Sequence, residues 1–196
     1  ALNMEVPMKV HSPIAPVAMA SRPLGLADWR LYLASALFAL ANLLVPMALH
    51  TIPDAGQIFL PMFFFTLLAA WQFGLFAGLA VAVASPLLSH FLTGMPLAVM
   101  LPAILSIAVA LALVAAILSA RTRAVSLPGI LVAIAAMQAA GFIVERIAGM
   151  PIEKSLTLLR MSIPGMLIML FGTYLLLRAV NQLLDRANRA DQSGKS

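Results

Sequence analysis

The sequence predicts an all-α integral membrane protein: a bundle of six transmembrane helices with both termini in the cytoplasm. Hydrophobic residues make up 63% of the 196 positions and charged residues only 10%, and the mean hydropathy is +1.03. A soluble domain has about 25% charged residues. The apolar residues form long stretches, and a bilayer core requires about 20 apolar residues per helix. We therefore expect one compact bundle embedded in a membrane.

Six apolar stretches are the predicted spans, at about 29–49, 58–71, 75–88, 97–120, 127–147 and 158–180. The second and third are short and are joined by only Gln72, Phe73 and Gly74. Residues 1–28 contain four prolines and no sustained periodicity, which predicts a mobile cytoplasmic leader. Residues 181–196 are polar and predict a cytoplasmic tail that frays. The expected organisation is thus a leader (1–28), a six-helix domain (29–180) and a tail (181–196).

The distribution of lysine and arginine predicts the orientation. With the N-terminus inside, nine of the twelve basic residues lie on the inner side and three on the outer side. The inner set is Lys9, Arg22, Arg30, Arg121, Arg123, Arg178, Arg186, Arg189 and Lys195, and the outer set is Arg146, Lys154 and Arg160. This asymmetry satisfies the positive-inside rule. Five spans would place the basic tail and the Arg121 to Arg123 link on opposite faces, so we predict six.

Composition and motifs exclude several function classes. The chain has no cysteine, which excludes disulfides, thiolate metal sites and cysteine nucleophiles. Its net charge of +5 comes from basic residues scattered singly, with no patch of the kind that binds nucleic acid. A P-loop is absent, so the chain cannot hydrolyse ATP itself. Serine hydrolase chemistry from Ser85 or Ser89 with His90 is disfavoured, because the sequence has no G-x-S-x-G elbow. We predict that the protein is not an enzyme.

Polar residues gather on the predicted outer side and are the candidate substrate-binding residues. Polar groups within a membrane are costly and mark functional sites. They are His50, Asp54 and Gln57 in the first outer loop, Ser85, Ser89, His90 and Thr93 at the end of the third span, and Gln138 and Glu145 on the fifth. Five prolines, Pro46, Pro61, Pro86, Pro102 and Pro164, also fall in the outer halves of spans, and broken helices often form substrate sites in transporters.

Each of these residues also has a structural interpretation. The two histidines could lie in interfacial water, and Asp54 could be a turn residue after proline. Gln138 could make an interhelical hydrogen bond, and Glu145 could be an end charge that reaches the interface beside Arg146. The prediction of a site therefore depends on their clustering. We expect the stretch from Pro86 to Pro102 to cap that site.

Two further predictions concern metal and partner contacts. His50 and His90 are on separate loops without H-x-x-x-H spacing, so we expect them to contact a metal only if the ligand itself carries one. On the first span, Ser35, Ala36 and Ala39 form a small-residue surface that would let another helix approach closely. Gly74 and Gly78 form a second such pair, for which packing within the bundle is the favoured interpretation.

The segments FLPMFFFTLLAAWQFGLFAGL (Phe59 to Leu79) and SPLLSHFLTGMP (Ser85 to Pro96), with six short spans, resemble the substrate-binding S components of energy-coupling factor (ECF) vitamin transporters. The resemblance covers roughly residues 29–180. It implies uptake of a vitamin or similar micronutrient, bound at the outer face of a bacterial cytoplasmic (inner) membrane. It also implies docking through Ser35, Ala36 and Ala39 on a transmembrane coupling subunit with two cytoplasmic ATPases, or else a solitary mode.

The expected ligand is cobalamin or another corrinoid, and no resident cofactor is expected. Aromatic residues are only 7% of the chain and the outer loops hold no tryptophan or tyrosine, which disfavours stacking of a small flat ring. A large ligand held by hydrogen bonds, with a histidine near its metal, fits better. Two alternatives remain open: a membrane-embedded enzyme, and a structural membrane protein without a small-molecule ligand.

Overall fold

The structure is a computed structural model that describes residues 17–18, 23–48 and 60–193. Within these ranges the fold is all-α, as predicted, with seven α-helices and one two-residue strand pair. The helices are α1 (Trp29–Ala48), α3 (Pro61–Phe73), α4 (Leu75–Thr93), α5 (Leu101–Thr122), α6 (Leu127–Ile147), α7 (Ile152–Met161) and α8 (Ile163–Ser193), with a 3₁₀ turn, Ala98–Met100, before α5. Strands β1 (Val17–Ala18) and β2 (Ala124–Val125) pair antiparallel.

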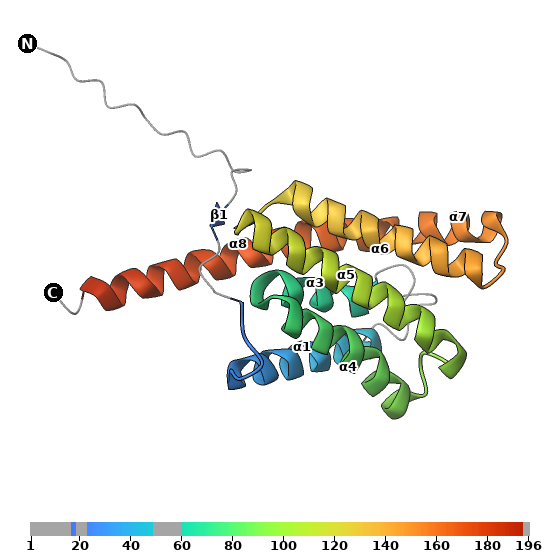
Figure 1. The fold of residues 1–196 in the computed structure, drawn as a ribbon, viewed down its shortest axis with the longest axis horizontal. Coiled ribbons are helices and arrows are strands. Elements are labelled where there is room, and N and C mark those ends of the chain that lie inside the picture. The colour runs from blue at the N-terminus through green and yellow to red at the C-terminus, as the bar shows by residue number, and fades with distance from the viewer. Residues whose placement is uncertain (1–16, 19–22, 49–59, 194–196) are drawn as a thin grey trace, which may run out of the picture.

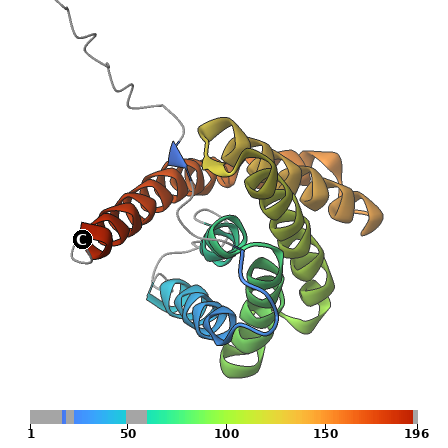
Figure 2. The ribbon, with the colours of Figure 1, turned by 60° about the vertical axis from the view of Figure 1, so that its left-hand side comes forward.

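Helix α3 is the centre of the bundle. Figure 2 shows it in the middle, with the other long helices around it. The residues from Thr66 to Gln72 are all buried, and Trp71 has no exposed surface. A helix that is apolar on every side is stable only where protein or lipid surrounds it. Here α1, α4, α5 and α8 all pack against α3, which explains why its sequence is almost entirely apolar.

The long helices run side by side and leave the bundle with two distinct ends (Figure 1). One, which we name the Gly74 end, holds Gly74, Arg123 and the start of α1. The other, which we name the Gly94 end, holds Gly94, Gly149 and the start of α5. Helix α8 runs past the Gly74 end, on the same side from which α1 enters. The described chain therefore enters and leaves the bundle at one end.

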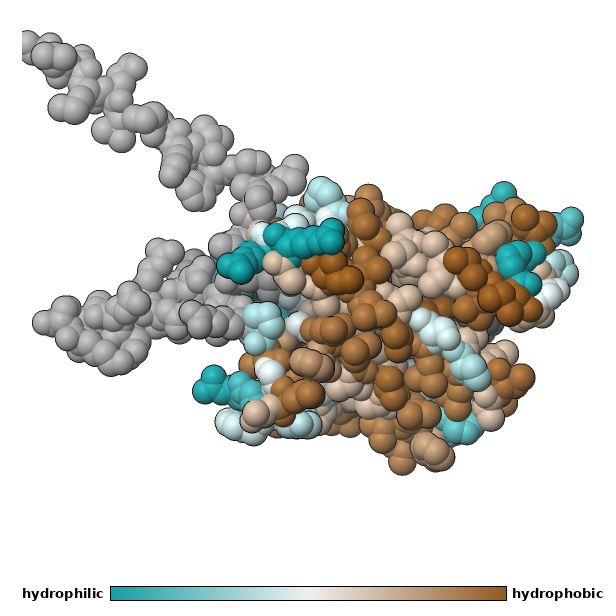
Figure 3. Space-filling view, in the orientation of Figure 1, coloured by the Kyte–Doolittle hydropathy of each residue, from teal (hydrophilic) through white to brown (hydrophobic). Residues whose placement is uncertain are grey.

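The surface of the bundle identifies it as a multi-pass membrane protein. Leu37, Leu44, Val99 and Leu175 are among many large apolar side chains that are exposed on the outer faces of the helices. Figure 3 shows these brown surfaces across the middle of the molecule, with the hydrophilic surface gathered toward the ends. Four described helices are long and apolar enough to cross a membrane, whereas α1 and α3 are shorter apolar helices. The structure thus establishes four candidate spans, fewer than the six predicted.

The helix bounds differ most from the predicted spans at α4, α7 and α8. Helix α6 has the predicted bounds, but α4 and α8 extend to Thr93 and Ser193. The tail expected to fray after Val180 is instead a continuation of α8. The expected linker 148–157 contains most of α7, a separate short helix. In the predicted leader, Val17 and Ala18 pair with β2, and the Leu24 N–H donates to the Phe73 carbonyl at 2.9 Å.

Three prolines lie at the beginnings of helices and do not break them. Pro61 and Pro102 lie in the first turns of α3 and α5, and Pro164 is the second residue of α8. Proline is accommodated in a first turn because that N–H has no partner within the helix. Pro86 is inside α4, which continues past it as a helix. Most of the prolines that suggested broken helices therefore mark the beginnings of helices.

Gly78 sets the distance between α3, α4 and α5. A Cβ on this residue would lie 2.5 Å from the Ala70 Cβ and 3.3 Å from the Ala112 Cβ. The prediction of packing within the bundle is confirmed for Gly78, whereas a Cβ at Gly74 would meet Pro23 of the preceding segment at 2.9 Å. Small residues allow this approach, and dispersion contacts between close backbones hold helices together in lipid.

Gly78→Ala should destabilise the bundle, because the added methyl group must displace the backbone of α3. We expect a loss of about 1–3 kcal/mol in the free energy of unfolding, measured by thermal or denaturant unfolding in detergent. Gly25→Ala is the control, since a methyl group added there would meet no atom within 4 Å. Equal stability of the two variants would contradict the proposed close contact.

Candidate functional site

The second half of α4 carries four of the predicted site residues, and they face different surroundings. Ser85 and Ser89 are one helical turn apart on a buried face, with Ser85 fully enclosed. His90 is half-buried, and Thr93 at the end of the helix is exposed. Two of the four therefore lie within the bundle, and two lie where α4 meets the following turn.

Ser85 is bonded to Asn42, a residue that is absent from the predicted site. The Asn42 Nδ2 of α1 donates to the Ser85 Oγ at 2.8 Å, and both residues are buried. The Asn42 Oδ1 is buried with no hydrogen-bond partner among the described residues. This pair joins α1 to α4 in an otherwise apolar contact. An asparagine inside an apolar span is itself the signal that could have identified it.

Thr93 and His90 hold the turn that follows α4. The Thr93 Oγ1 lies 2.6 Å from the Ser89 carbonyl oxygen and accepts a bond from the Met95 N–H at 3.3 Å. The His90 Nδ1 lies 2.8 Å from the Pro96 carbonyl oxygen. Because a carbonyl oxygen can only accept, Nδ1 carries a proton, and in the neutral form of the ring Nε2 therefore has the lone pair. The turn is thus fastened to α4 by both side chains.

Gln138 and Glu145 are on α6, which lies across α5 from α4 (Figure 1). The Gln138 Nε2 is 2.9 Å from the Ser162 Oγ and 3.2 Å from the Met166 Sδ, so it joins α6 to α8. Gln138 therefore makes the interhelical hydrogen bond that the sequence offered as a structural alternative to ligand binding. Glu145 is half-buried near the Gly94 end, beside Arg146. Both are remote from the buried Ser85, although all lie on the half of the bundle toward the Gly94 end.

Arg146 is a residue of this end whose structural role the sequence did not reveal. Its Nη2 donates to the buried Ser155 Oγ of α7 at 2.8 Å. Its guanidinium lies 5.3 Å from the centre of the Phe142 ring, within range of a cation–π contact. Arg146 therefore ties α7 to the end of α6.

The first outer loop cannot be placed in this arrangement. His50, Asp54 and Gln57 lie outside the described residues. Among the residues that are described, no group of three or more histidine, cysteine, aspartate or glutamate side chains could hold a metal ion. His90 is thus the described member of the predicted histidine pair.

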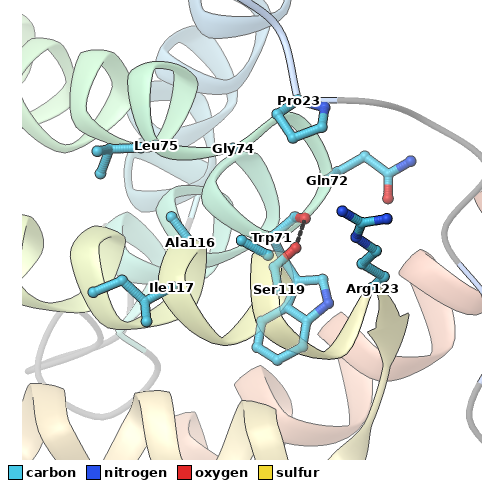
Figure 4. A pocket seen from close by; sticks show the side chains of 10 residues that line it. Pro23, Trp71, Gln72, Gly74, Leu75, Ala116, Ile117, Ser119 and Arg123 are labelled. Atoms are coloured by element: carbon cyan, nitrogen blue, oxygen red, sulfur yellow. Dashed lines mark hydrogen bonds between the residues drawn. The ribbon is translucent and has the colours of Figure 1, made fainter.

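Two buried contacts at the Gly74 end also go beyond what the sequence predicted. The Asn181 Nδ2 of α8 donates to the Gln72 Oε1 of α3 at 3.0 Å. The Ser119 Oγ of α5 donates to the Trp71 carbonyl oxygen at 2.6 Å, the bond drawn in Figure 4. Asn181 belongs to the predicted fraying tail, and its burial shows that the packed part of α8 extends beyond Val180.

A cavity of about 920 Å³ opens beside these contacts. Its walls come from the turn between α3 and α4, from the last turns of α5, and from Pro23 (Figure 4). The lining is mostly apolar, with Gln72, Ser119 and Arg123 as its polar side chains. None of the predicted substrate-binding residues that the structure describes contributes to it.

A second cavity is a groove of about 460 Å³ between α1 and α4. The three predicted docking residues, Ser35, Ala36 and Ala39, line its α1 wall. Ala80 and Ala84 line the facing wall on α4. The Ser35 hydroxyl is buried without a partner among the described residues. The small side chains on both walls would allow another apolar chain to approach closely, and leucines complete the lining.

No protein-family model, curated protein or solved structure matches this chain. The function is therefore proposed from its own residues and from the resemblance in the sequence.

Removing the Ser85 hydroxyl should leave the buried Asn42 amide without its described partner. We expect Ser85→Ala to lower the free energy of unfolding by about 1 kcal/mol, since interhelical hydrogen bonds in membranes contribute about 0.6–2 kcal/mol. The double variant Asn42→Leu, Ser85→Ala should be less destabilised than the sum of the single variants. Strict additivity in this double-mutant cycle would show that the two side chains do not interact.

Proposed function

We propose that this protein is the substrate-capturing membrane component of a micronutrient uptake system, similar to an ECF S component. Its bundle would bind a vitamin-type molecule at the Gly94 end. The observation that carries the proposal is that this end combines connecting segments with polar side chains fastened by neighbours. His90 and Thr93 hold the turn after α4, Gln138 bonds Ser162, and Arg146 bonds Ser155.

The proposed topology has six spans, with α1 and α3 as the short ones. Helix α3, at about 20 Å for 13 residues, is enclosed by other helices and need not match the bilayer by itself. Among the described residues, Arg30, Arg121, Arg123 and Arg178 lie on the half toward the Gly74 end, and Arg146, Lys154 and Arg160 lie toward the Gly94 end. With the further basic residues of both chain ends, the positive-inside rule would place the Gly74 end in the cytoplasm.

Cobalamin or another corrinoid remains the proposed ligand. The hydrogen bond of the His90 Nδ1 to the Pro96 carbonyl fixes a tautomer whose Nε2 can accept a bond or contact a metal. That is the arrangement found at histidines that contact metals, where the second ring nitrogen is held by a neighbouring oxygen. The cobalt would enter as part of the substrate, and His50 is the second histidine proposed for it.

The groove between α1 and α4 supports a proposed docking site for a transmembrane coupling subunit with two cytoplasmic ATPases. Small residues on both walls would allow a partner helix to approach closely, and van der Waals contact of this kind drives helix association in lipid. The Ser35 hydroxyl could bond a polar group of the partner. Energy would come from the ATPases, since this chain has no P-loop of its own.

A stability screen tests capture and ligand together. A ligand that binds only the folded protein raises its melting temperature by mass action. We expect cobalamin, among a panel of vitamins, to raise the melting temperature of the purified full chain and to co-purify as corrinoid absorbance. His90→Ala should weaken the apparent affinity about tenfold, the equivalent of one lost hydrogen bond or metal contact.

His11→Ala is the matched control, because His11 is the histidine that is not proposed to contact the ligand and belongs to the N-terminal segment. It should bind like the unmodified protein. Stabilisation by another vitamin alone would reject the corrinoid and retain micronutrient capture. No stabilisation by any member of the panel would contradict the proposed function.

A further inference from the structure

The cavity at the Gly74 end has an apolar wall that faces the surroundings of the bundle. Leu75, at the start of α4, and Ile117, on α5, both line it and are 37% and 49% exposed. Ala120, one turn nearer the end of α5, is also exposed. In a bilayer these side chains would contact acyl chains, so the cavity opens toward lipid and not only toward water.

The opposite wall of the cavity carries the positively charged guanidinium of Arg123. Arg123 adopts a left-handed backbone conformation, with a φ of 47°, and its N–H caps α5 through the Ser119 carbonyl at 2.8 Å. Figure 4 shows its guanidinium lying on the Gln72 side of the cavity. Within the described part of the chain, the guanidinium has no hydrogen bond or ion pair, and no carboxylate lines the cavity. Among the described side chains, the charge at this end of the cavity is therefore positive.

The distance between the apolar wall and the guanidinium is suited to a membrane surface, where acyl chains give way to polar headgroups. Ile117 and Arg123 are six residues apart on one helix end, which corresponds to about 9 Å along the axis. Apolar contacts thus lie deeper in the bundle and the guanidinium lies at its end. Basic pockets between transmembrane helices on the cytoplasmic side bind lipid headgroups for this reason.

We propose that this cavity binds one anionic phospholipid, with its phosphate on Arg123 and an acyl chain along Leu75 and Ile117. A free phosphate fits less well, because the lining is mostly apolar and offers one guanidinium. The proposal does not depend on micronutrient uptake; it requires only that the Gly74 end is at a membrane surface. Lipid bound there would fasten the α3–α4 turn to the end of α5.

Lipid-dependent stability of the full chain in neutral detergent tests this site. Phosphatidylglycerol should raise the melting temperature with a saturable dependence on concentration, whereas phosphatidylcholine and inorganic phosphate should not. Arg123→Gln should weaken the apparent affinity for phosphatidylglycerol about tenfold or more. Ile117→Trp should also weaken it, by filling the apolar half of the cavity.

Each variant has a matched control. Arg121→Gln removes an exposed charge from the same end of α5 outside the cavity lining, and Leu113→Trp enlarges an exposed side chain one turn before Ile117. Both should bind phosphatidylglycerol like the unmodified protein. Ile117→Trp keeps every charge, so it remains decisive should Arg123→Gln lower the melting temperature in detergent alone.

Three results would overturn the proposal. Equal loss in Arg121→Gln and Arg123→Gln would indicate a general charge effect. Equal stabilisation by phosphatidylcholine would remove the role of the anionic headgroup. Equal stabilisation by inorganic phosphate would indicate a free-anion site without the acyl contact.

Discussion

The bundle depends on close packing and on hydrogen bonds between helices, because apolar side chains gain little hydrophobic free energy from one another when the alternative is contact with lipid. Among the described residues, such bonds involve α1, α3, α4, α5, α6 and α8. Asn42 and Ser85 join α1 to α4, and Ser119 and Trp71 join α5 to α3. Gln72 and Asn181 join α3 to α8, and Gln138 joins α6 to Ser162, between α7 and α8, and to Met166 of α8. Between them, close contact at Gly78 lets α3, α4 and α5 share one core.

The two ends of the bundle differ in the segments and polar groups that connect the helices. At the Gly74 end, short turns, a buried Gln72–Asn181 bond and the β1–β2 pair connect the helices closely. At the Gly94 end the connections carry His90, Arg146 and α7, whose polar groups bond to neighbouring segments. In the proposed account, the first end meets the cytoplasm and anionic lipid, and the second captures substrate.

The sequence predicted the class and most helix positions, because apolar stretches report lipid contact directly. It predicted α6 with the observed bounds. It missed α7, whose charged Glu153, Lys154 and Arg160 are typical of a loop but also of one face of a short helix. It ended α8 too early, because polarity after Val180 resembles loss of structure although the residues there retain good helix propensity.

The site residues were harder to predict than the helices. Ser85 was predicted to contact the ligand. Its actual neighbour depends on how α1 and α4 are rotated about their axes, which the sequence does not reveal. That rotation places Asn42 opposite Ser85. The sequence placed Gln138 on the fifth span, but it did not reveal Ser162 as its partner, because their pairing depends on the path of the chain through α7.

Site-specific labelling of single cysteines measures most directly whether the two ends lie on opposite sides of the membrane. The chain has no cysteine, so Lys154→Cys and Arg121→Cys each provide one thiol, at an exposed position of the Gly94 end and the Gly74 end respectively. A membrane-impermeant maleimide applied to intact cells should label Lys154→Cys at once and Arg121→Cys only after permeabilisation. The reverse pattern, or equal labelling of both in intact cells, would contradict substrate capture at an outward-facing Gly94 end.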